Sequence, residues 1–416
     1  MQKKEASSPP MISVEKALQT ILQCQQDFGT ETISFEHSPG RVLKEALFAD
    51  RDFPPFNRVC MDGIALQLAA FDSGLRSFTI EGVQAAGSPQ KTLVNIQNCL
   101  EVMTGAVLPQ HTDIVIPYEQ IEIKNGVAQI KVDQVRFYQN IHQKGSDKKQ
   151  GDLLISTNKQ ITAAEIGVMA TVGKTHVVVA KQPKVMVIST GDELVEVSET
   201  PLEHQIRKSN VHSLVSLLKN RHISADTAHL PDDKDRLKIN IEQFLNSYDV
   251  LLFSGAVSKG KFDFLPEVLE ELGVKKSFHK VKQRPGKPFW FGQFNSLSEK
   301  NTQKKTTIFA FPGNPISAYV NCLKYFYPWI RKSTGLNLQN ETAELGAEIN
   351  FQPQMTYFLQ VTLTSQNGKC IAMPLPGNGS GDLANLVIAD AFIELPADRN
   401  TFQKGEVYPV LRYRNF

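Results

Sequence analysis

Cysteines are few in this chain and are not arranged in pairs. Five occur among 416 residues, an odd number, and no two of them have the C-x-x-C spacing. This pattern argues against a disulfide framework and against a zinc site built from thiolates. Because free thiols persist in reducing compartments, the cysteine content favours a cytoplasmic protein.

Long apolar runs are missing, and so is an excess of charge of one sign. No stretch reaches the roughly 18 consecutive apolar residues of a membrane span, and the first residues contain no apolar segment of signal-peptide length. The 45 basic and 43 acidic residues leave a net charge of only +2, which gives no global attraction to nucleic acid or to an anionic membrane. We therefore expect no nucleic acid and no membrane as partners, and any charged ligand must be held locally.

The composition is that of a globular protein, with 41% hydrophobic and 21% charged residues. At about 150 residues per domain, the length predicts more than one domain. Changes in pattern divide the chain into a mixed α/β linking domain (1–52 and 148–182), a β-rich barrel-like domain (53–147), an α/β domain (183–333) and a small C-terminal β domain (334–416). The predicted fold class is multidomain α/β plus β.

Strand-length apolar runs alternate with helical patterns within 183–333. Residues 185–190, 249–254 and 308–311 are apolar runs of the kind found in sheets covered on both faces. Two apolar stripes at helical spacing lie between the first two runs: Val211, Leu214, Leu217 and Leu218, then Leu237, Ile241, Phe244 and Leu245. This segment is therefore predicted to be a doubly wound, mostly parallel α/β domain. Another helix is predicted over Ile12–Leu22, behind Ser13 as N-cap.

Four loops rich in Gly, Pro and polar residues follow the predicted strands. They are TGDE (190–193), GAVSKGKFD (255–263), QRPGKP (283–288) and PGNP (312–315). Ligands of open α/β sheets bind at the carboxyl ends of the strands, where these loops meet. Glycines let backbone amides approach an anion, and Lys and Arg side chains add positive charge. The loops together predict a pocket for a phosphorylated ligand.

Each loop also has a simpler interpretation. TGDE is compatible with an ordinary turn, and PGNP with a turn and a helix that begins at Pro315. The spacing G-x-x-x-x-G-K occurs at 255–261, but Phe262 stands where a P-loop carries the hydroxyl that binds Mg²⁺, which argues against a P-loop. The residues alone leave Asp263 open between a metal ligand and a helix N-cap.

Polar clusters also occur at apparent strand ends in the β-rich half. They are PPFNRVCMDG (54–63), MTGAVLP (103–109) and NIHQKGSD (140–147). Taken singly, Asp62, Thr104 and Asp147 in these clusters are ordinary loop residues.

Seven motifs, taken in order, resemble those of one family. They are PPFNRVCMDG, MTGA, GSD, STGDEL, SGAVSKGKFD, RPGKP and FPGNP. In this order and at these separations they are similar to the molybdopterin molybdenumtransferase family of the bacterial MoeA type, which is itself similar to the E domain of gephyrin. The resemblance extends over essentially the whole chain. It implies that residues 183–333 form a domain of the molybdopterin-binding type.

The resemblance implies a transferase of molybdenum cofactor biosynthesis. Members transfer molybdate to the dithiolene of adenylylated molybdopterin, with Mg²⁺-dependent release of AMP. They are homodimers with the active site between the subunits. Mg²⁺ is then the expected cofactor, and adenylylated molybdopterin and molybdate are the expected substrates. The resemblance also allows the molybdopterin adenylyltransferase as a partner.

Site residues follow from the resemblance position by position. The catalytic candidates are Asp62, Thr104, Asp147, Glu193, Asp232 and Asp263. Two of these, Glu193 and Asp263, are the candidate metal ligands. The substrate-binding candidates are Gly191, Ser254, Gly255, Ser258, Gly260, Lys280, Arg284, Lys287, Pro312, Gly313, Asn314, Pro315 and Ser380.

Three positions depart from the family pattern. Ala256 replaces the second glycine of SGG, so a methyl group sits where a positive φ or close ligand contact is expected. His142 replaces the arginine of N-[IV]-R-x-x-G-x-D, so we expect a fixed cation to be lost. Arg284 replaces a lysine before PGKP, which keeps the charge but changes an ammonium into a fork of donors.

Two other functions stay open from the sequence. Residues 183–333 also resemble the smaller molybdopterin adenylyltransferases, and the similarity to gephyrin allows a non-catalytic scaffold. The adenylyltransferases lack flanking β domains, so the length of this chain argues against the first alternative. The acids at Asp62, Asp147, Glu193 and Asp263 argue against the second, because a scaffold has no need of carboxylates in a desolvated pocket.

Overall fold

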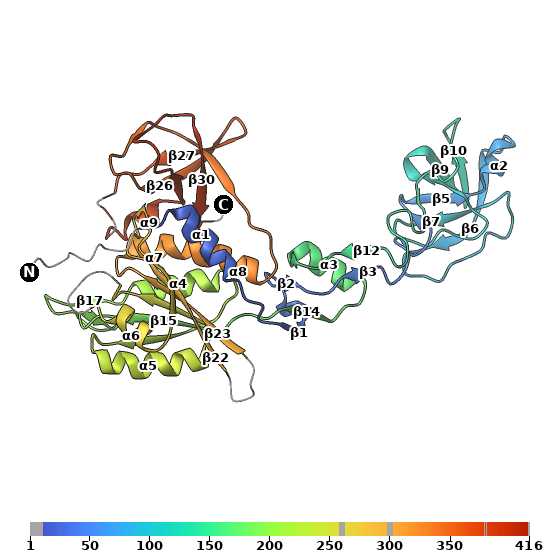
Figure 1. Ribbon diagram of the computed structural model, residues 1–416. Coiled ribbons are helices and arrows are strands. Elements are labelled where there is room, and N and C mark those ends of the chain that lie inside the picture. Colours follow the sequence, from blue (N-terminus) through green and yellow to red (C-terminus); the bar gives the residue numbers. More distant parts are fainter. Residues whose placement is uncertain (1–10, 258–262, 298–302, 378, 380, 415–416) are drawn as a thin grey trace, which may run out of the picture. The chain divides into compact units, whose positions relative to one another are not determined.

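The computed structural model describes residues 11–257, 263–297, 303–377, 379 and 381–414. The chain forms two compact units (Figure 1). The first comprises the residues up to Ile33, residues 38–44 and those from Val178 onward, and the second comprises residues 34–37 and 45–177. In these described parts no helix is both long and apolar enough to cross a membrane. All five cysteines are free thiols.

A six-stranded sheet lies at the centre of the first unit, with the order β18-β15-β19-β23-β22-β20. Its strands are β15 (Val185–Thr190), β18 (Ala225–Leu230), β19 (Val250–Ser254), β20 (Lys275–His279), β22 (Trp290–Leu297) and β23 (Gln303–Phe311). Four neighbouring strands, β18, β15, β19 and β23, run parallel to one another. β22 is antiparallel to β23, and β20 is antiparallel to β22. The prediction of a mostly parallel central sheet is therefore confirmed.

Helices cover both faces of this sheet, as alternate residues of its strands require. One face packs against α1 (Val14–Gln23), α4 (Asn210–Lys219), α7 (Pro315–Asn321) and α8 (Tyr327–Ser333), with a π-helical turn at Cys322–Phe326. The other face packs against α5 (Lys234–Ser247) and α6 (Leu265–Glu271). Both predicted apolar stripes face the sheet, and Ser13 accepts a hydrogen bond from Lys16 N as the N-cap of α1.

The C-terminal part of the first unit is a small β structure. Its strands are β21 (Gln283–Arg284), β24 (Glu341–Leu345), β26 (Thr356–Gln366), β27 (Lys369–Pro374), β28 (Ala391–Leu395) and β30 (Val407–Arg412). Because β26 pairs with both β27 and β28, the strands β26-β27-β24-β30-β28 close into a five-stranded barrel. A short pair, β25 (Ile349–Asn350) and β29 (Thr401–Phe402), and the helix α9 (Asn385–Ile388) complete this part.

The second unit is mostly β structure, as predicted for residues 53–147. Its main sheet has the order β8-β5-β7-β6-β10-β9. The strands are β5 (Gly63–Leu66), β6 (Ser77–Gln84), β7 (Cys99–Val102), β8 (Ile114–Pro117), β9 (Ile121–Lys124) and β10 (Val127–Ile130). A short helix that the sequence did not indicate, α2 (Leu68–Asp72), begins where Asp113 Oδ1 accepts a hydrogen bond from Leu68 N.

Shorter elements complete the second unit and the passages between the units. In the second unit β4 (Arg58–Val59) pairs with β11 (Ile141–His142), β3 (Leu47–Phe48) pairs with β12 (Leu153–Ile155), and α3 spans Ala163–Thr171. The chain passes between the units in the sheet of β1 (Thr30–Ser34), β14 (His176–Ala180), β2 (Val42–Leu43) and β13 (Lys159–Gln160). The four-domain division stays a prediction.

Candidate active site

The carboxyl ends of four parallel strands open into a cavity of about 480 Å³. Thr190 ends β15, Ser254 ends β19, Pro312 follows β23 and Asp232 follows β18, and all four line this cavity. We call it the loop cavity. Ten of the predicted site residues line it: Gly191, Glu193, Asp232, Ser254, Gly255, Asp263, Pro312, Gly313, Asn314 and Pro315. The structure thus brings together loops that are far apart in the sequence.

The turn after β19 leaves no room for an additional side-chain atom. Gly255 has φ +115, and a Cβ added there would lie 2.6 Å from Thr190 Oγ1. Ala256 has φ +54, in the left-handed region that costs an alanine roughly 1–2 kcal/mol. The expected positive φ at the departure from SGG is therefore confirmed. The Thr190 hydroxyl oxygen, Oγ1, lies against this turn. It is buried and has no hydrogen-bond partner among the described residues.

Three acids line the loop cavity, namely Glu193, Asp232 and Asp263. Burial raises the pKa of the Asp232 carboxyl, and the negative charges of Asp192, Glu193 and Asp263 raise it further. Within the described ranges no three Cys, His or acidic side chains converge on a single point as a metal cage. A Mg²⁺ ion usually takes only one or two carboxylates and completes its shell with water and phosphate oxygens. The donor set, with Glu193 and Asp263 as predicted ligands, fits Mg²⁺ in that form.

The structure excludes one of the two interpretations of Asp263, the helix N-cap, and leaves its role as a metal ligand a prediction. The N-cap of α6 is Phe264, and it makes no side-chain capping bond. The helix N-cap interpretation of Asp263 is therefore wrong, because the helix begins one residue too late. By contrast, α7 begins at Pro315, as the simpler interpretation of PGNP predicts. The same residue both starts the helix and lines the loop cavity.

Asn210 holds two of these loops together, although sequence analysis did not select it. Its Nδ2 donates to Ser254 Oγ at 2.8 Å and to the Gly313 carbonyl at 2.7 Å. The neighbouring Arg207 and Lys208 also line the loop cavity. The signal that sequence reasoning passed over is a basic and polar run, RKSN, directly before a predicted helix.

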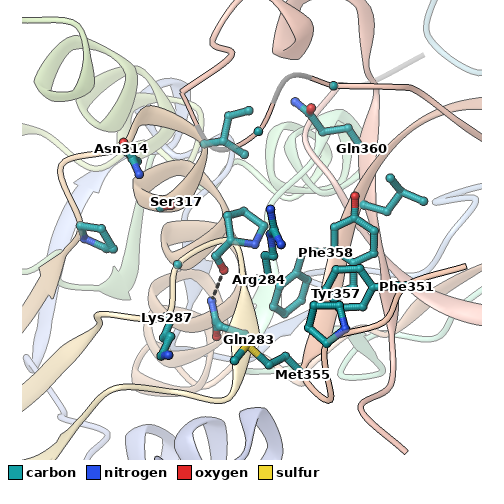
Figure 2. A pocket seen from close by; sticks show the side chains of 18 of the residues that line it. Gln283, Arg284, Lys287, Asn314, Ser317, Phe351, Met355, Tyr357, Phe358 and Gln360 are labelled. Atoms are coloured by element: carbon teal, nitrogen blue, oxygen red, sulfur yellow. Dashed lines mark hydrogen bonds between the residues drawn. The ribbon is translucent and has the colours of Figure 1, made fainter. Parts of the chain in front are cut away.

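A second cavity of about 720 Å³ lies between the central sheet domain and the C-terminal barrel. We call it the barrel cavity. It shares Pro288, Pro312 and Asn314 with the loop cavity, so the two adjoin. Figure 2 shows Asn314 and Ser317 on one side, Phe351, Tyr357 and Phe358 on the other, and Arg284 between them. Two predicted residues, Arg284 and Lys287, line only this second cavity.

Aromatic rings and a fixed arginine characterise the barrel cavity. Phe351 and Tyr357 are stacked, with ring centroids 4.1 Å apart and an interplanar angle of 10°. Burial raises the pKa of the Tyr357 hydroxyl, and the positive charge of Arg284 opposes that shift. The strand β21 pairs with β26, which makes Arg284 the register partner of Tyr357. A flat heterocycle and an anionic group are the ligand chemistry that such a wall accepts.

A buried polar network supports the loop that carries Arg284. Gln283 donates to Asn321 Oδ1 at 2.7 Å and to the Pro285 carbonyl at 2.9 Å, and it accepts a hydrogen bond from Tyr325. A Cβ at Gly286 would lie 2.6 Å from the Gln283 side chain. The loop is therefore held from inside the protein, and its outer side faces the barrel cavity.

Of the four other substrate-binding candidates, the structure describes only Lys280. Lys280 lines neither the loop cavity nor the barrel cavity, because it lies in the turn after β20 with φ +79 and its N–H donates to the Phe289 carbonyl. Ser258, Gly260 and Ser380 lie outside the described residues.

Asp62 and Thr104 form a pair in the second unit. Asp62 Oδ1 accepts hydrogen bonds from Thr104 N at 2.6 Å and from Thr104 Oγ1 at 2.7 Å. These two bonds, the backbone one first, lower the pKa of the Asp62 carboxyl. These bonds favour the ionised carboxylate, and two residues that look ordinary in the sequence form one polar unit.

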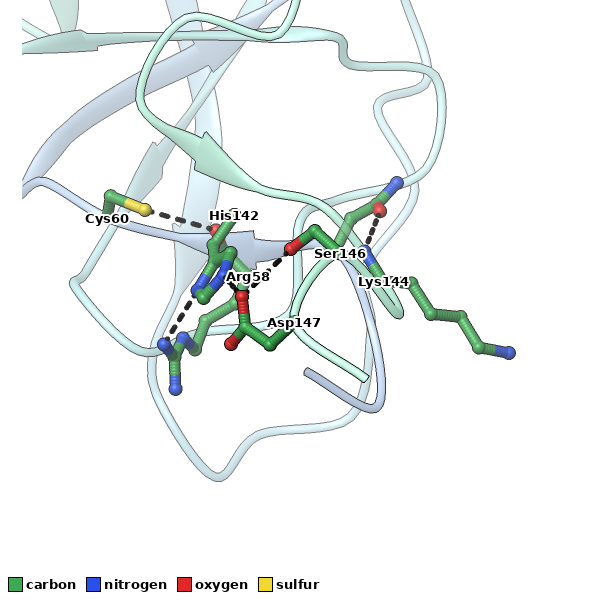
Figure 3. A network of polar contacts seen from close by, with 7 residues as sticks. Arg58, Cys60, His142, Lys144, Ser146 and Asp147 are labelled. Carbon is green, nitrogen blue, oxygen red and sulfur yellow. Dashed lines mark hydrogen bonds and ion pairs between the residues drawn. The ribbon is translucent and has the colours of Figure 1, made fainter. Parts of the chain in front are cut away.

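Asp147, also in the second unit, belongs to another network. Figure 3 shows it beside His142 and Ser146, with Arg58 on the far side of the histidine ring. The hydrogen bond with His142 lowers the pKa of the Asp147 carboxyl. Sequence analysis selected Asp147 and His142 but not Arg58.

Three family models match consecutive parts of the chain. They are the MoeA N-terminal region (domains I and II) at 12–173, a probable molybdopterin-binding domain at 186–332 and the MoeA C-terminal region (domain IV) at 342–413.

Relatives match at full length. A molybdopterin molybdenumtransferase of Synechocystis is 40% identical, covering 96% of this chain and 99% of its own, and one of Bacillus subtilis is 29% identical, covering 97% and 94%. A solved molybdopterin biosynthesis MoeA protein from Pyrococcus horikoshii has a TM-score of 0.80 at 25% identity, covering 97% and 100%. The chain belongs to the molybdopterin molybdenumtransferase family.

Proposed function

We propose that this protein inserts molybdenum into molybdopterin, the activity named for its relatives. In this reaction molybdate is transferred to the dithiolene of adenylylated molybdopterin, and AMP is released. The observation that carries the proposal is the pair of adjoining cavities at the carboxyl edge of the central sheet. A molecule with a pterin at one end, an adenosine at the other and phosphates between them has the length and chemistry to occupy both.

The phosphates are assigned to the junction of the two cavities. Pro312 and Asn314 line both cavities there, and Lys287 and Arg284 line the barrel cavity. Glycine turns beside them expose backbone N–H groups to an anion. The stacked Phe351 and Tyr357 would accept one of the two flat ring systems. In this arrangement the lysine and the arginine bind and orient the phosphates, while the barrel side chains exclude water from one end.

Glu193 and Asp263 are proposed to hold Mg²⁺ in the loop cavity, with Asp232 close by. A bound Mg²⁺ would stabilise the negative charge that develops on the phosphate oxygens as the P–O bond breaks. The raised pKa of Asp232 supports this assignment, because after burial its causes are the neighbouring negative charges of Asp192, Glu193 and Asp263, which a bound cation would offset. Asn210 keeps the loops after β19 and β23 together, which holds the cavity wall in position.

The acids of the second unit are proposed to complete the site from a neighbouring subunit. Asp62, Thr104 and Asp147 belong to the second unit, whereas Glu193 and Asp263 belong to the first. A homodimer with the active site between its subunits would bring the two sets together. The free cysteines support a reducing, cytoplasmic location for this dimer.

The test is AMP release from adenylylated molybdopterin in the presence of Mg²⁺, measured with and without molybdate. We expect release that depends on Mg²⁺ and increases with molybdate, together with molybdenum bound to the pterin product. Synthesis of adenylylated molybdopterin from molybdopterin and ATP would instead identify an adenylyltransferase. Absence of both reactions, with tight binding of a partner peptide, would favour a scaffold.

A further inference from the structure

The strand pair β4–β11 in the second unit places an arginine beside a histidine. Arg58 is the antiparallel register partner of His142. The Arg58 guanidinium lies 3.0 Å from His142 Nδ1, and His142 Nε2 lies 2.7 Å from Asp147 Oδ1. The three side chains form one line of contacts from a cation to a carboxylate (Figure 3).

The chemistry of the donors assigns the proton on the ring. A guanidinium has N–H donors and no acceptor, so His142 Nδ1 must accept from Arg58. The proton of a neutral imidazole then resides on Nε2, which donates it to Asp147. His142 is therefore a neutral bridge in this arrangement, and the positive charge of the network resides on Arg58.

Arg58 thus restores the cation that the sequence comparison predicts to be lost. The family pattern has an arginine at the position of His142, and Arg58 lies directly across the strand pair from that position. Asp147 interacts with Arg58 through the ring of His142, and its Oδ1 also accepts a hydrogen bond from Ser146 Oγ. One oxygen of the carboxylate, Oδ1, is therefore occupied by its own donors, and the exposed guanidinium keeps further N–H groups for a ligand.

A cavity of about 300 Å³ lies beside this guanidinium. Its lining, all from the second unit, is Arg51, Phe53, Pro54, Pro55, Arg58, Asp147 and Thr171. The space is sufficient for a phosphoryl or molybdate group, and the fork of a guanidinium matches two oxygens of such a group.

We propose that Arg58 binds a tetrahedral oxyanion during molybdenum transfer and that His142 and Asp147 position it. The oxyanion is molybdate or a phosphoryl group of the adenylylated substrate. This inference rests on the proposed function and identifies a residue that supplies positive charge from the second unit. It also reverses the expectation that the cation is lost at His142.

The test compares four variants with the wild-type protein. They are Arg58→Gln, His142→Arg, the double variant Arg58→Gln/His142→Arg, and the control Arg136→Gln, which alters an exposed arginine elsewhere in the second unit. Calorimetry measures the Kd for molybdate alone, and AMP release measures the KM for adenylylated molybdopterin. A change in Kd assigns the oxyanion to molybdate, and a change confined to KM assigns it to the phosphoryl group.

Arg58→Gln should raise either the Kd for molybdate or the KM for adenylylated molybdopterin about tenfold. This is the loss of affinity expected when a charge-assisted hydrogen bond is removed. The double variant should regain most of that loss, because it returns a cation to the opposite strand. His142→Arg alone should gain little, since Arg58 already supplies the charge, and Arg136→Gln should match the wild type. Nitrogen-15 NMR of His142 should show Nδ1 without a proton.

Two results would overturn the inference. One is an Arg58→Gln variant with wild-type Kd and KM, and the other is a gain of about tenfold by His142→Arg alone, which would mean that the wild type lacks the cation. If Arg58→Gln does not fold, as circular dichroism would reveal, the His142→Arg result decides the question. In either case AMP release by the wild type tests the proposed function separately.

Discussion

The hydroxyl of Thr104 contributes to the lowered pKa of the Asp62 carboxyl. Thr104 donates both its backbone N–H and its hydroxyl to Asp62 Oδ1, and these bonds lower the pKa of the carboxyl. Any residue except proline at 104 can supply the backbone bond, but only a hydroxyl residue can supply the second. A substitution that removes the hydroxyl alone therefore separates the two contributions.

In Thr104→Val we expect the pKa of Asp62 to move up toward its ordinary value, while Thr104→Ser should keep it low. A carboxyl with a lowered folded-state pKa adds stability above its unfolded pKa, and this stability is lost as the pH falls through the folded pKa. Thr104→Val should therefore be less stable than wild type at neutral pH, with a difference that shrinks in acid. Carboxyl carbon-13 NMR titration measures the pKa directly. An unchanged pKa in Thr104→Val would show that the hydroxyl bond does not form in solution.

Asp263→Ala should abolish AMP release and leave the fold intact. The residue lines the loop cavity and contributes to the raised pKa of Asp232, so its removal takes away a proposed metal ligand and one source of repulsion. Added Mg²⁺ should raise the Tm of the wild type, because a ligand that binds the folded state stabilises it, and it should raise that of Asp263→Ala much less.

The matched control is Glu242→Ala, which removes an exposed acid of α5. It should keep both AMP release and the response of the Tm to Mg²⁺. Near-normal turnover by Asp263→Ala at saturating Mg²⁺ would refute the assignment of Asp263 to the metal.

Single residues could be predicted where they follow a recognisable strand. Pro312 comes directly after an apolar run and Glu193 three residues after one, so their place at the carboxyl edge followed from the pattern. Asn210 and Arg58 could not be found in this way, because their roles depend on partners that are 44 and 84 positions away in the chain. The substrate-binding role of Lys280 stays a prediction, since this residue lies in a turn that lines neither of the two adjoining cavities.

The turn after β19 requires glycine at position 255, whereas the neighbouring loop after β23 has room for a side chain at position 313. Gly255 has φ +115 and lies against Thr190, whereas a Cβ at Gly313 would meet only Gly255 Cα, at 3.7 Å. Both residues line the loop cavity. Substitution by alanine at these two positions therefore gives a matched pair of variants. Both alter the wall of the same cavity, but only the alanine at 255 clashes with a neighbouring residue.

Gly255→Ala should destabilise the protein by about 2 kcal/mol or more, because the new methyl group combines a disallowed φ with a clash at Thr190. Gly313→Ala should stay within about 0.5 kcal/mol of wild type. Urea unfolding followed by tryptophan fluorescence measures both, since Trp290 and Trp329 are buried in the first unit. Equal losses in the two variants would contradict the steric argument.

Strands and helices were predictable where burial on both faces leaves an apolar run. The predicted strand 185–190 agrees with β15 to the residue, and β19 begins one residue after its prediction. β23 begins five residues before the predicted 308 because Thr306 and Thr307 are buried polar residues, and the Thr306 hydroxyl bonds to the Leu245 and Tyr248 carbonyls. Such distant partners leave no periodic signal in the local sequence.

The barrel cavity exists because one short strand, β21, leaves the central sheet domain and joins the C-terminal barrel. β21 pairs in parallel with β26, and this pairing sets Arg284 beside Tyr357. The motif QRPGKP indicated a ligand loop, but nothing in it identified its partner strand. Sequence analysis also missed the stacked rings of Phe351 and Tyr357. These rings can contact a ligand only because the barrel closes next to the RPGKP loop, which the local sequence does not indicate.

A mixture of two inactive variants can test whether each active site is built from two subunits. In Asp62→Ala the second unit is altered, and in Asp263→Ala the first unit is altered, so each homodimer should lack activity. After unfolding and refolding together, half of the dimers should be mixed, and each would contain one site with both acids intact. We therefore expect roughly a quarter of the wild-type rate of AMP release from the refolded mixture.

Sites built within a single subunit give a different result, because every subunit in the mixture then carries one of the two defects. The refolded mixture would stay inactive, and the shared site would be excluded. Mixing the two native homodimers without refolding is the control, and it should give no activity until the subunits exchange. The rate at which activity appears in that control then measures the exchange itself, so a stable dimer would recover slowly and a weak one within the time of mixing.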